Sequence, residues 1–215
     1  MPKEIFNKLL EDLLVRRPGL ESSSAQIRTA YELLKTGYDA DKKLLICGNG
    51  GSAADCDHIV TELMNRFAFK RALPATVKAQ LNAGPNGSLL VEQLQPGLPA
   101  ISLASQSGLI TAISNDLDPA LIFAQQIMGY GNMGDVLLAI STSGNSKNIL
   151  LAVETAKALG MQTVGLSGRL GGELKNLCDI TITVDAEDTK EIQELHLPVY
   201  HLICQALESY YFEQA

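Results

Sequence analysis

Two of the three histidines in this chain stand where they could bind a metal or move protons. His58 lies four residues before Glu62 in a segment with helical spacing, so both side chains lie on one helix face. His201 lies in a second helical segment, near the C-terminus, that also contains Gln193 and His196. Imidazole, carboxylate and amide oxygen atoms are ligands that suit zinc. A carboxylate and an imidazole can also transfer protons near neutral pH without a metal.

Gln193 and His201 can bind the same ligand only if the helix that carries them bends. Eight residues separate Gln193 from His201, which on an ideal helix is two turns plus about 80°. Pro198 lies between them and gives the helix a reason to bend or break. With such a bend, His58, Glu62, Gln193 and His201 form a zinc ligand set. The alternative is a surface ion pair at 58 and 62 together with a core histidine.

A glycine-rich turn, GNGGSA at 48–53, follows the apolar run LLI and precedes the segment that contains His58. It fits the relaxed dinucleotide-binding pattern G-x-G-x-x-A. That pattern needs an acidic residue about 20 positions later to hold a ribose hydroxyl. Residues 67–73, FAFKRAL, contain no acid, and no Gly-Lys-Ser/Thr of a P-loop follows the turn. We therefore do not expect a nicotinamide site here.

A second polar turn favours a different ligand. LLAISTSGNS at 137–146 repeats the order of apolar strand, short Gly/Ser/Asn turn and helix. Both turns would lie at the carboxyl ends of parallel strands, where such sheets place ligands. A helix N-terminus with free N–H groups favours an anion, so the hydroxyls of Ser141, Thr142, Ser143 and Ser146 could hold a phosphate. One such cluster alone is explained by helix capping, but two in one sheet favour a phosphosugar site.

The elements that carry these residues alternate between strand and helix. Apolar runs predict strands at 42–47, 99–104, 135–141, 162–167 and 179–184. Amphipathic spacing predicts helices at 3–16, 23–37, 52–66, 146–159 and 190–213. This alternation predicts an α/β fold with a mostly parallel sheet covered on both faces.

We expect one domain over residues 1–215, with N-terminal helices in 1–38. Residues 68–98 break the rhythm, since the stretch 72–99 has four prolines and three glycines, and they contain helix-like pieces at 75–82 and 88–94. This segment is interpreted as an insertion that serves either as a surface excursion or as a substrate lid or oligomer contact.

Composition excludes several classes of protein. The chain has 215 residues, a net charge of −7 and no basic stripe, which argues against a nucleic-acid partner. No apolar run is long enough for a membrane span, and the N-terminus does not read as a signal peptide. The cysteines lack CxxC spacing, so we expect reduced thiols and a cytoplasmic protein. They are Cys47, Cys56, Cys178 and Cys204.

Five motifs together resemble the phosphoheptose isomerases, which are SIS (sugar isomerase) domain proteins. The motifs, in chain order, are CGNGGS (47–52), the His58/Glu62 pair, SNDLD (114–118), ISTSGNS (140–146) and IQELHLPVYH (192–201). The resemblance covers the chain from about residue 40 to 210, apart from 68–98. It implies a three-layer sandwich with a five-stranded sheet of the flavodoxin-like or Rossmann-like type. It also implies conversion of sedoheptulose 7-phosphate to D-glycero-D-manno-heptose 7-phosphate.

The resemblance also implies roles for residues at matching positions. Glu62 and His201 match the proton-transfer pair, and the same two residues with His58 and Gln193 match the ligands of one zinc ion. The family forms homotetramers with sites at subunit interfaces. The matching substrate-binding positions are Asn49, Gly50, Gly51, Ser52, Glu62, Asn115, Asp116, Ser141, Thr142, Ser143, Ser146 and Gln193.

Two alternatives to this isomerase stay open. Some SIS proteins do not catalyse and instead sense phosphosugars or associate with the replication initiator, but the initiator-binding relatives lack the histidine that matches His201. Isomerisation or deamination of another sugar phosphate is the other alternative. Lys190, which stands where the family commonly has a sugar-binding aspartate, and the 68–98 segment bear on the choice of sugar.

Overall fold

The computed structural model describes residues 2–213, and its centre is a five-stranded sheet. The strands are β1 (Leu44–Gly48), β2 (Ala100–Ser102), β3 (Val136–Ile140), β4 (Gln162–Ser167) and β5 (Ile180–Thr183). Their order is β2-β1-β3-β4-β5, and all pairs are parallel. This confirms the predicted α/β fold and places every predicted strand.

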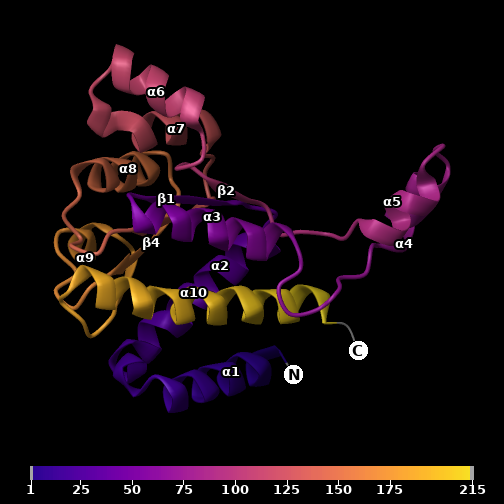
Figure 1. Ribbon diagram of the computed structural model, residues 1–215, viewed down its shortest axis with the longest axis horizontal. Coiled ribbons are helices and arrows are strands. Elements are labelled where there is room, and N and C mark those ends of the chain that lie inside the picture. The colour runs from indigo at the N-terminus through magenta and orange to yellow at the C-terminus, as the bar shows by residue number, and fades with distance from the viewer. Residues whose placement is uncertain (1, 214–215) are drawn as a thin grey trace.

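Helices cover both faces of the sheet (Figure 1). One face packs against α2 (Ser24–Asp39), α3 (Gly51–Met64) and α10 (Thr189–Phe212), with α1 (Pro2–Arg16) outside α10. The other packs against α7 (Ile122–Tyr130), α8 (Lys147–Ala158) and α9 (Leu174–Leu177). Along β1, Leu44 and Ile46 join the first core, and Leu45 and Cys47 join the second, as the two-residue period of a strand requires.

Short elements complete the connections. A 3₁₀ turn, η1 (Pro18–Ser23), joins α1 to α2. Helix α6 (Ser107–Asp116) and the 3₁₀ turn η2 (Pro119–Leu121) precede α7. The sequence pattern did not resolve these elements, because α6 buries only Ile113 and therefore shows little apolar periodicity.

Pro198 does not interrupt α10, contrary to the expectation from sequence. The helix runs from Thr189 to Phe212 with Pro198 inside it. Proline costs one backbone hydrogen bond at this position. Neighbouring apolar residues, including Val199, Leu202 and Ile203, are buried in the core, and this packing offsets that cost.

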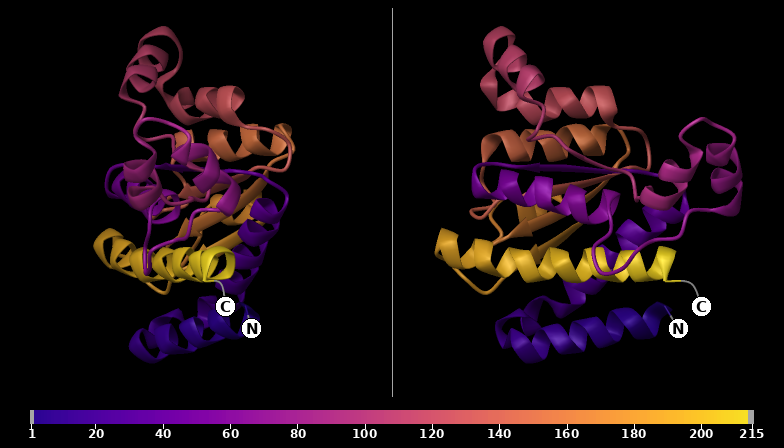
Figure 2. Two further views of the ribbon diagram at one scale, coloured as in Figure 1. Left: turned by 90° about the vertical axis from the view of Figure 1, so that its right-hand side faces the viewer. Right: turned by 45° about the vertical axis from the view of Figure 1, so that its right-hand side comes forward.

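The segment 68–98 forms an arm that stands away from the body (Figure 2). It contains α4 (Ala75–Asn82) and α5 (Gly87–Gln93), which match the two helical pieces expected from the sequence. Helix α4 has no buried residue, and α5 buries only Gly87. A role as lid or oligomer contact stays a prediction.

A buried ion pair holds the base of this arm. Arg71 is 1% exposed, and its Nε donates to Oε1 of Glu208 on α10 over 2.9 Å. The same guanidinium donates to the backbone carbonyls of Glu62 and Leu63, each over 2.7 Å. Carbonyls in the last turn of a helix have no partner within the helix. Arg71 therefore satisfies the end of α3 and ties it to α10.

Glu208 completes the connection from the other side. Its carboxylate accepts hydrogen bonds from the backbone N–H groups of Phe67 and Ala68, over 2.8 and 2.6 Å. Both oxygens of this buried side chain thus have partners, which a buried charge requires. The chain leaving α3 is fixed to α10 before the arm begins.

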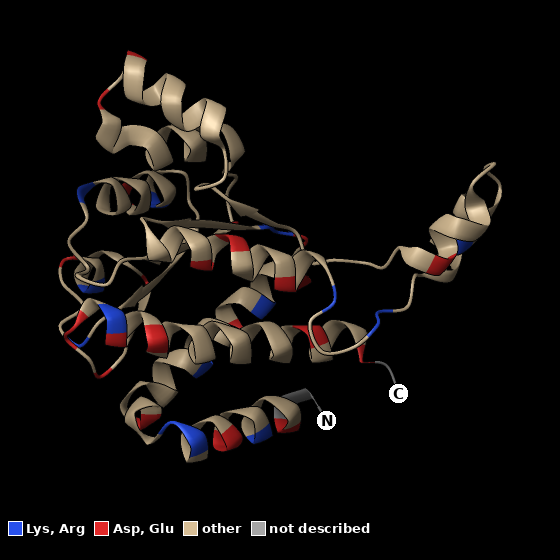
Figure 3. Cartoon of the chain, viewed as in Figure 1, with Lys and Arg blue, Asp and Glu red and all other residues tan. Residues whose placement is uncertain are grey.

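Charges and thiols are distributed as in an ordinary globular surface and core. Residues of both signs lie along α1 and α10, whereas α6 and α7 together carry only Asp116 (Figure 3). The cysteines are all free, and three of the four are buried. Between residues 2 and 213, no helix combines the length and the apolar character needed to cross a membrane.

Glu208→Gln should lower the free energy of unfolding by about 3 kcal/mol, because it leaves the Arg71 guanidinium buried without a counter-charge. Urea denaturation followed by circular dichroism measures this. The matched control is Glu194→Gln, which makes the same change at an exposed position of the same helix and should cost less than about 0.5 kcal/mol. Equal stabilities of the two variants would contradict the anchoring role of the pair.

Candidate active site

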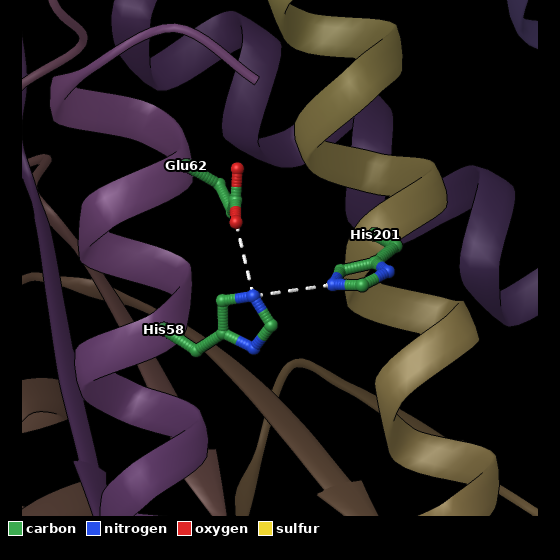
Figure 4. A group of neighbouring side chains, drawn as sticks. All are labelled: His58, Glu62 and His201. Carbon is green, nitrogen blue, oxygen red and sulfur yellow. Dashed lines mark hydrogen bonds and ion pairs between the residues drawn. The ribbon is translucent and has the colours of Figure 1, made fainter. Parts of the chain in front are cut away.

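His58, Glu62 and His201 converge between α3 and α10 (Figure 4). Nε2 of His58 lies 2.9 Å from Oε1 of Glu62 and 3.4 Å from Nε2 of His201. One donor atom from each side chain lies within 4.8 Å of the others. The sequence therefore identified side chains on two helices that are distant in the chain and adjacent in space.

Helix packing explains this convergence. Helix α3 buries Cys56, Ile59 and Leu63 in the core, which leaves His58 and Glu62 on the side toward α10. All three side chains of the cluster are partly buried. Among them, His201 also contacts Phe67, with ring centroids 5.2 Å apart. The site is partly sheltered from water and still open to a ligand.

The imidazoles differ in their proton affinity. Burial and the neighbouring His58 lower the pKa of His201 from its usual value, so His201 is neutral at neutral pH. His196 is fully buried, and this burial lowers its pKa to about 4. His196 lies in the core outside the cluster, which leaves His58 and His201 as the histidines that can serve it.

The spacing of the three donors fits a small cation. In a tetrahedral zinc site with ligands at about 2.0–2.1 Å, neighbouring ligand atoms lie about 3.3 Å apart. The two separations from Nε2 of His58, 2.9 and 3.4 Å, bracket that spacing. Two imidazole nitrogens and a carboxylate are also the donor types that zinc prefers.

The two polar turns lie side by side at the carboxyl ends of β1 and β3. Asn49 and Asn148 exchange two side-chain hydrogen bonds, of 2.9 and 2.8 Å, which join the first turn to the start of α8. Gly50 has a φ of 55°, which favours glycine. Ser52 is buried in the first turn of α3.

The second turn is shaped by its own hydroxyls and one glycine. The Oγ atoms of Ser141 and Ser146 lie 3.1 Å apart, and Ser146 directly precedes α8. Ser143 Oγ accepts a hydrogen bond from the backbone of Asn145. Gly144 has a φ of 67°, and a Cβ there would lie 1.9 Å from the carbonyl oxygen of Gly171. This turn presents hydroxyls at a helix N-terminus, as anion binding requires.

Within one chain, Glu62 and His201 lie away from the polar turns along their helices. Ser52 and Glu62 lie ten residues apart on α3, which is about 15 Å along the helix axis. The amide of Gln193 lies against Gly51, at the beginning of α3. Gln193 is therefore placed beside the polar turns, about 12 Å along α10 from His201.

Asn115 and Asp116 lie at the exposed end of α6, bonded to each other over 2.8 Å. An ion pair between Asp118 and Lys147, with atoms 3.3 Å apart, connects the chain after α6 to the first turn of α8. The predicted "ND" position thus belongs to the end of the molecule that carries the polar turns rather than to the histidine cluster.

Sequence reasoning missed three polar side chains near the cluster. The hydroxyl of Tyr200 bonds to both His58 and Asp55. Arg71 binds the carbonyl of Glu62 at the end of α3. Asp55 lies three residues before His58, so helical spacing could have indicated it. No local signal pairs Arg71 with Glu208, which is 137 residues away.

Comparisons with known proteins find relatives over most of the chain. A family model described as "SIS domain" matches residues 13–95 and 80–168. A phosphoheptose isomerase of Helicobacter pylori (strain P12) is 39% identical over 195 residues, which are 91% of this chain and 89% of that protein. The solved structure of a phosphoheptose isomerase from Francisella tularensis has a TM-score of 0.73 and 30% identity, and the match covers 94% of this chain and 96% of that one.

Gly144→Ala should lower the free energy of unfolding by about 1–3 kcal/mol, because the new Cβ meets the backbone of Gly171 and the φ of 67° is strained for alanine. Gly108→Ala in α6 is the matched control, since a Cβ there meets no atom within 4 Å. Thermal unfolding of both variants measures the difference. A Gly144→Ala protein as stable as the control would show that the turn adopts another conformation.

Proposed function

The chain belongs to the phosphoheptose isomerases of the SIS-domain family, and on that premise we propose that it converts sedoheptulose 7-phosphate to D-glycero-D-manno-heptose 7-phosphate. It is a phosphosugar isomerase. The observation that carries the assignment of the site is the cluster of His58, Glu62 and His201. A neutral imidazole beside a carboxylate is the pair of groups that an aldose–ketose isomerisation needs.

The two side chains divide the proton transfers between carbon and oxygen. Glu62 takes the proton from C1 of the ketose, next to the C2 carbonyl, while His201 gives a proton to the carbonyl oxygen. The product of this step is a 1,2-enediol. His201 then removes the proton from the C1 hydroxyl, and Glu62 returns a proton to C2, which yields the aldose with both residues restored. Because burial and the neighbouring His58 lower the pKa of His201, the donor in the first step is the N–H of a neutral imidazole.

We propose one zinc ion per chain as the cofactor, held by His58, Glu62 and His201. Gln193, the fourth predicted ligand, lies against Gly51, about 12 Å along α10 from His201. Zinc, when bound, polarises the substrate carbonyl as a Lewis acid. The spacing of the cluster supports this proposal, because the two donor distances from Nε2 of His58 are both close to one tetrahedral edge.

The polar turns bind the other end of the substrate. Hydroxyls at the start of α8 would hold the phosphate, because that helix end offers free N–H groups and a favourable dipole. The first turn and the "ND" dipeptide would contact the sugar. The phosphate-binding residues are Ser141, Thr142, Ser143 and Ser146; the sugar-binding residues are Asn49, Gly50, Gly51, Ser52, Glu62, Asn115, Asp116 and Gln193.

A homotetramer accounts for the separation between the two groups of residues. Glu62 lies about 15 Å along α3 from Ser52, in the first polar turn of its own chain. A neighbouring copy could place its own turn opposite the cluster, so that one site draws residues from two chains. We place this enzyme in the cytoplasm, in agreement with its four free cysteines.

Incubation with sedoheptulose 7-phosphate, read by NMR for an aldose product, tests the function. A panel of five-, six- and seven-carbon sugar phosphates, with and without added zinc, then identifies the preferred substrate. We expect the seven-carbon ketose to react fastest. Failure of every sugar to react, even with zinc, would favour a non-catalytic phosphosugar-binding role.

Glu62→Gln should reduce turnover by about 10²–10⁴-fold, because an amide cannot accept the proton from carbon. The fold should survive, since the side chain lies at a partly exposed site and bonds to His58 rather than to the core. Steady-state kinetics together with a urea melt separate the two effects. Glu154→Gln, on the exposed side of α8, is the control and should keep wild-type activity. Near-wild-type turnover in Glu62→Gln would exclude this residue as the base.

Removal of zinc with a chelator should abolish most of the activity, and added zinc should restore it, because the ion supplies the Lewis acid. Metal content measured by mass spectrometry should approach one zinc ion per chain in the active protein. Full activity in protein stripped of zinc would contradict the metal part of the proposal while leaving the proton-transfer pair in place.

A further inference from the structure

A hydrogen-bonded relay lies behind His58, on the side away from the cluster. Nδ1 of His58 lies 3.0 Å from the hydroxyl oxygen of Tyr200, and that hydroxyl donates to Oδ1 of Asp55 over 3.1 Å. We propose that Tyr200 and Asp55 are positioning residues that hold the imidazole of His58 with Nε2 toward Glu62 and His201, ready for the metal. The inference rests on the metal site of the proposed function.

The directions of the hydrogen bonds follow from the donors available. A phenol carries one proton, and an ionised carboxylate can only accept. Tyr200 therefore donates to Asp55, and its oxygen accepts the Nδ1–H of His58. The proton of a neutral His58 then lies on Nδ1, and the lone pair of Nε2 points at the cluster. A histidine that binds a metal through Nε2 needs this tautomer.

Among the residues that the structure describes, the side chain of Asp55 makes a hydrogen bond only with Tyr200. Its bond from Tyr200 is the one side-chain hydrogen bond that its Oδ1 makes, and its Oδ2 has no hydrogen-bond partner within residues 2–213. Asp55 lies three residues before His58 and so on the same face of α3. Its position serves the ring of His58 through Tyr200.

Tyr200 is well suited to hold such a ring still. Its side chain is 3% exposed and belongs to the core between the sheet and α10, so its hydroxyl is fixed by packing. The rings of His58 and Tyr200 meet edge to face, with centroids 5.5 Å apart. Because Tyr200 precedes His201 on α10, one helix both supplies a ligand and orients the ligand from α3.

A purely structural tyrosine would make a different contribution. Loss of its hydroxyl would then lower stability and leave zinc affinity unchanged. Loss of a partner that orients a metal-binding histidine instead lowers the affinity for the metal by about 10–100-fold. Zinc affinity, measured apart from turnover, separates the two roles.

The test is a zinc titration of metal-free protein in competition with a chromophoric chelator. Tyr200→Phe and Asp55→Asn should each bind zinc about 10–100-fold more weakly than wild type. The double variant should be no weaker than either single variant, because both changes break the same relay. Urea melts of each protein establish that it is folded.

Tyr211→Phe is the matched control. Tyr211 lies on the same helix, and its hydroxyl also donates to a carboxylate, Oδ1 of Asp39, over 2.8 Å. It does not contact the cluster, so its loss should change zinc affinity less than about twofold. Zinc affinity in Tyr200→Phe or Asp55→Asn equal to that of the control would overturn the relay alone. Absence of zinc binding in wild type would overturn the metal site and the relay together.

Discussion

The ion pair between Arg71 and Glu208 fixes the geometry on which the site depends. It is almost fully buried, and it joins the last turn of α3, the base of the arm and α10. A buried charge needs a partner with good geometry, so neither residue can move without cost. One member of the pair bonds the backbone of Glu62, the residue that we assign as the base. Fold and chemistry therefore share this contact.

With α3 and α10 held together, three side chains from distant parts of the chain meet at one point. Two of them come from successive turns of α3, and the third comes from a helix whose other face is buried in the core. Rigid helices position such groups better than loops do. The polar turns, in contrast, lie at the strand ends, near the other end of α3. The site of one chain is thus divided into a proton-transfer part and an anion-binding part.

Much of this was predictable from the sequence. The strands were placed because most of their residues are buried, which produces short apolar runs. The cluster was found because His58 and Glu62 share a helix face. The expectation that Pro198 interrupts the last helix was wrong, because core packing keeps α10 continuous. The position of Gln193 against Gly51 depends on how α10 is rotated relative to α3, and this is set by tertiary packing. Arg71 and Tyr200 have partners too distant in sequence for periodicity to reveal.

The central claim is that these two helices present His58, Glu62 and His201 as one set of donors, and the spectrum of the cobalt(II)-substituted protein tests it most directly. The claim predicts the strong visible absorption of four-coordinate cobalt, which His201→Gln should weaken or shift because one of the nitrogen ligands is lost. A spectrum that resembles the weakly absorbing aqua ion, in wild type as in the variant, would contradict it.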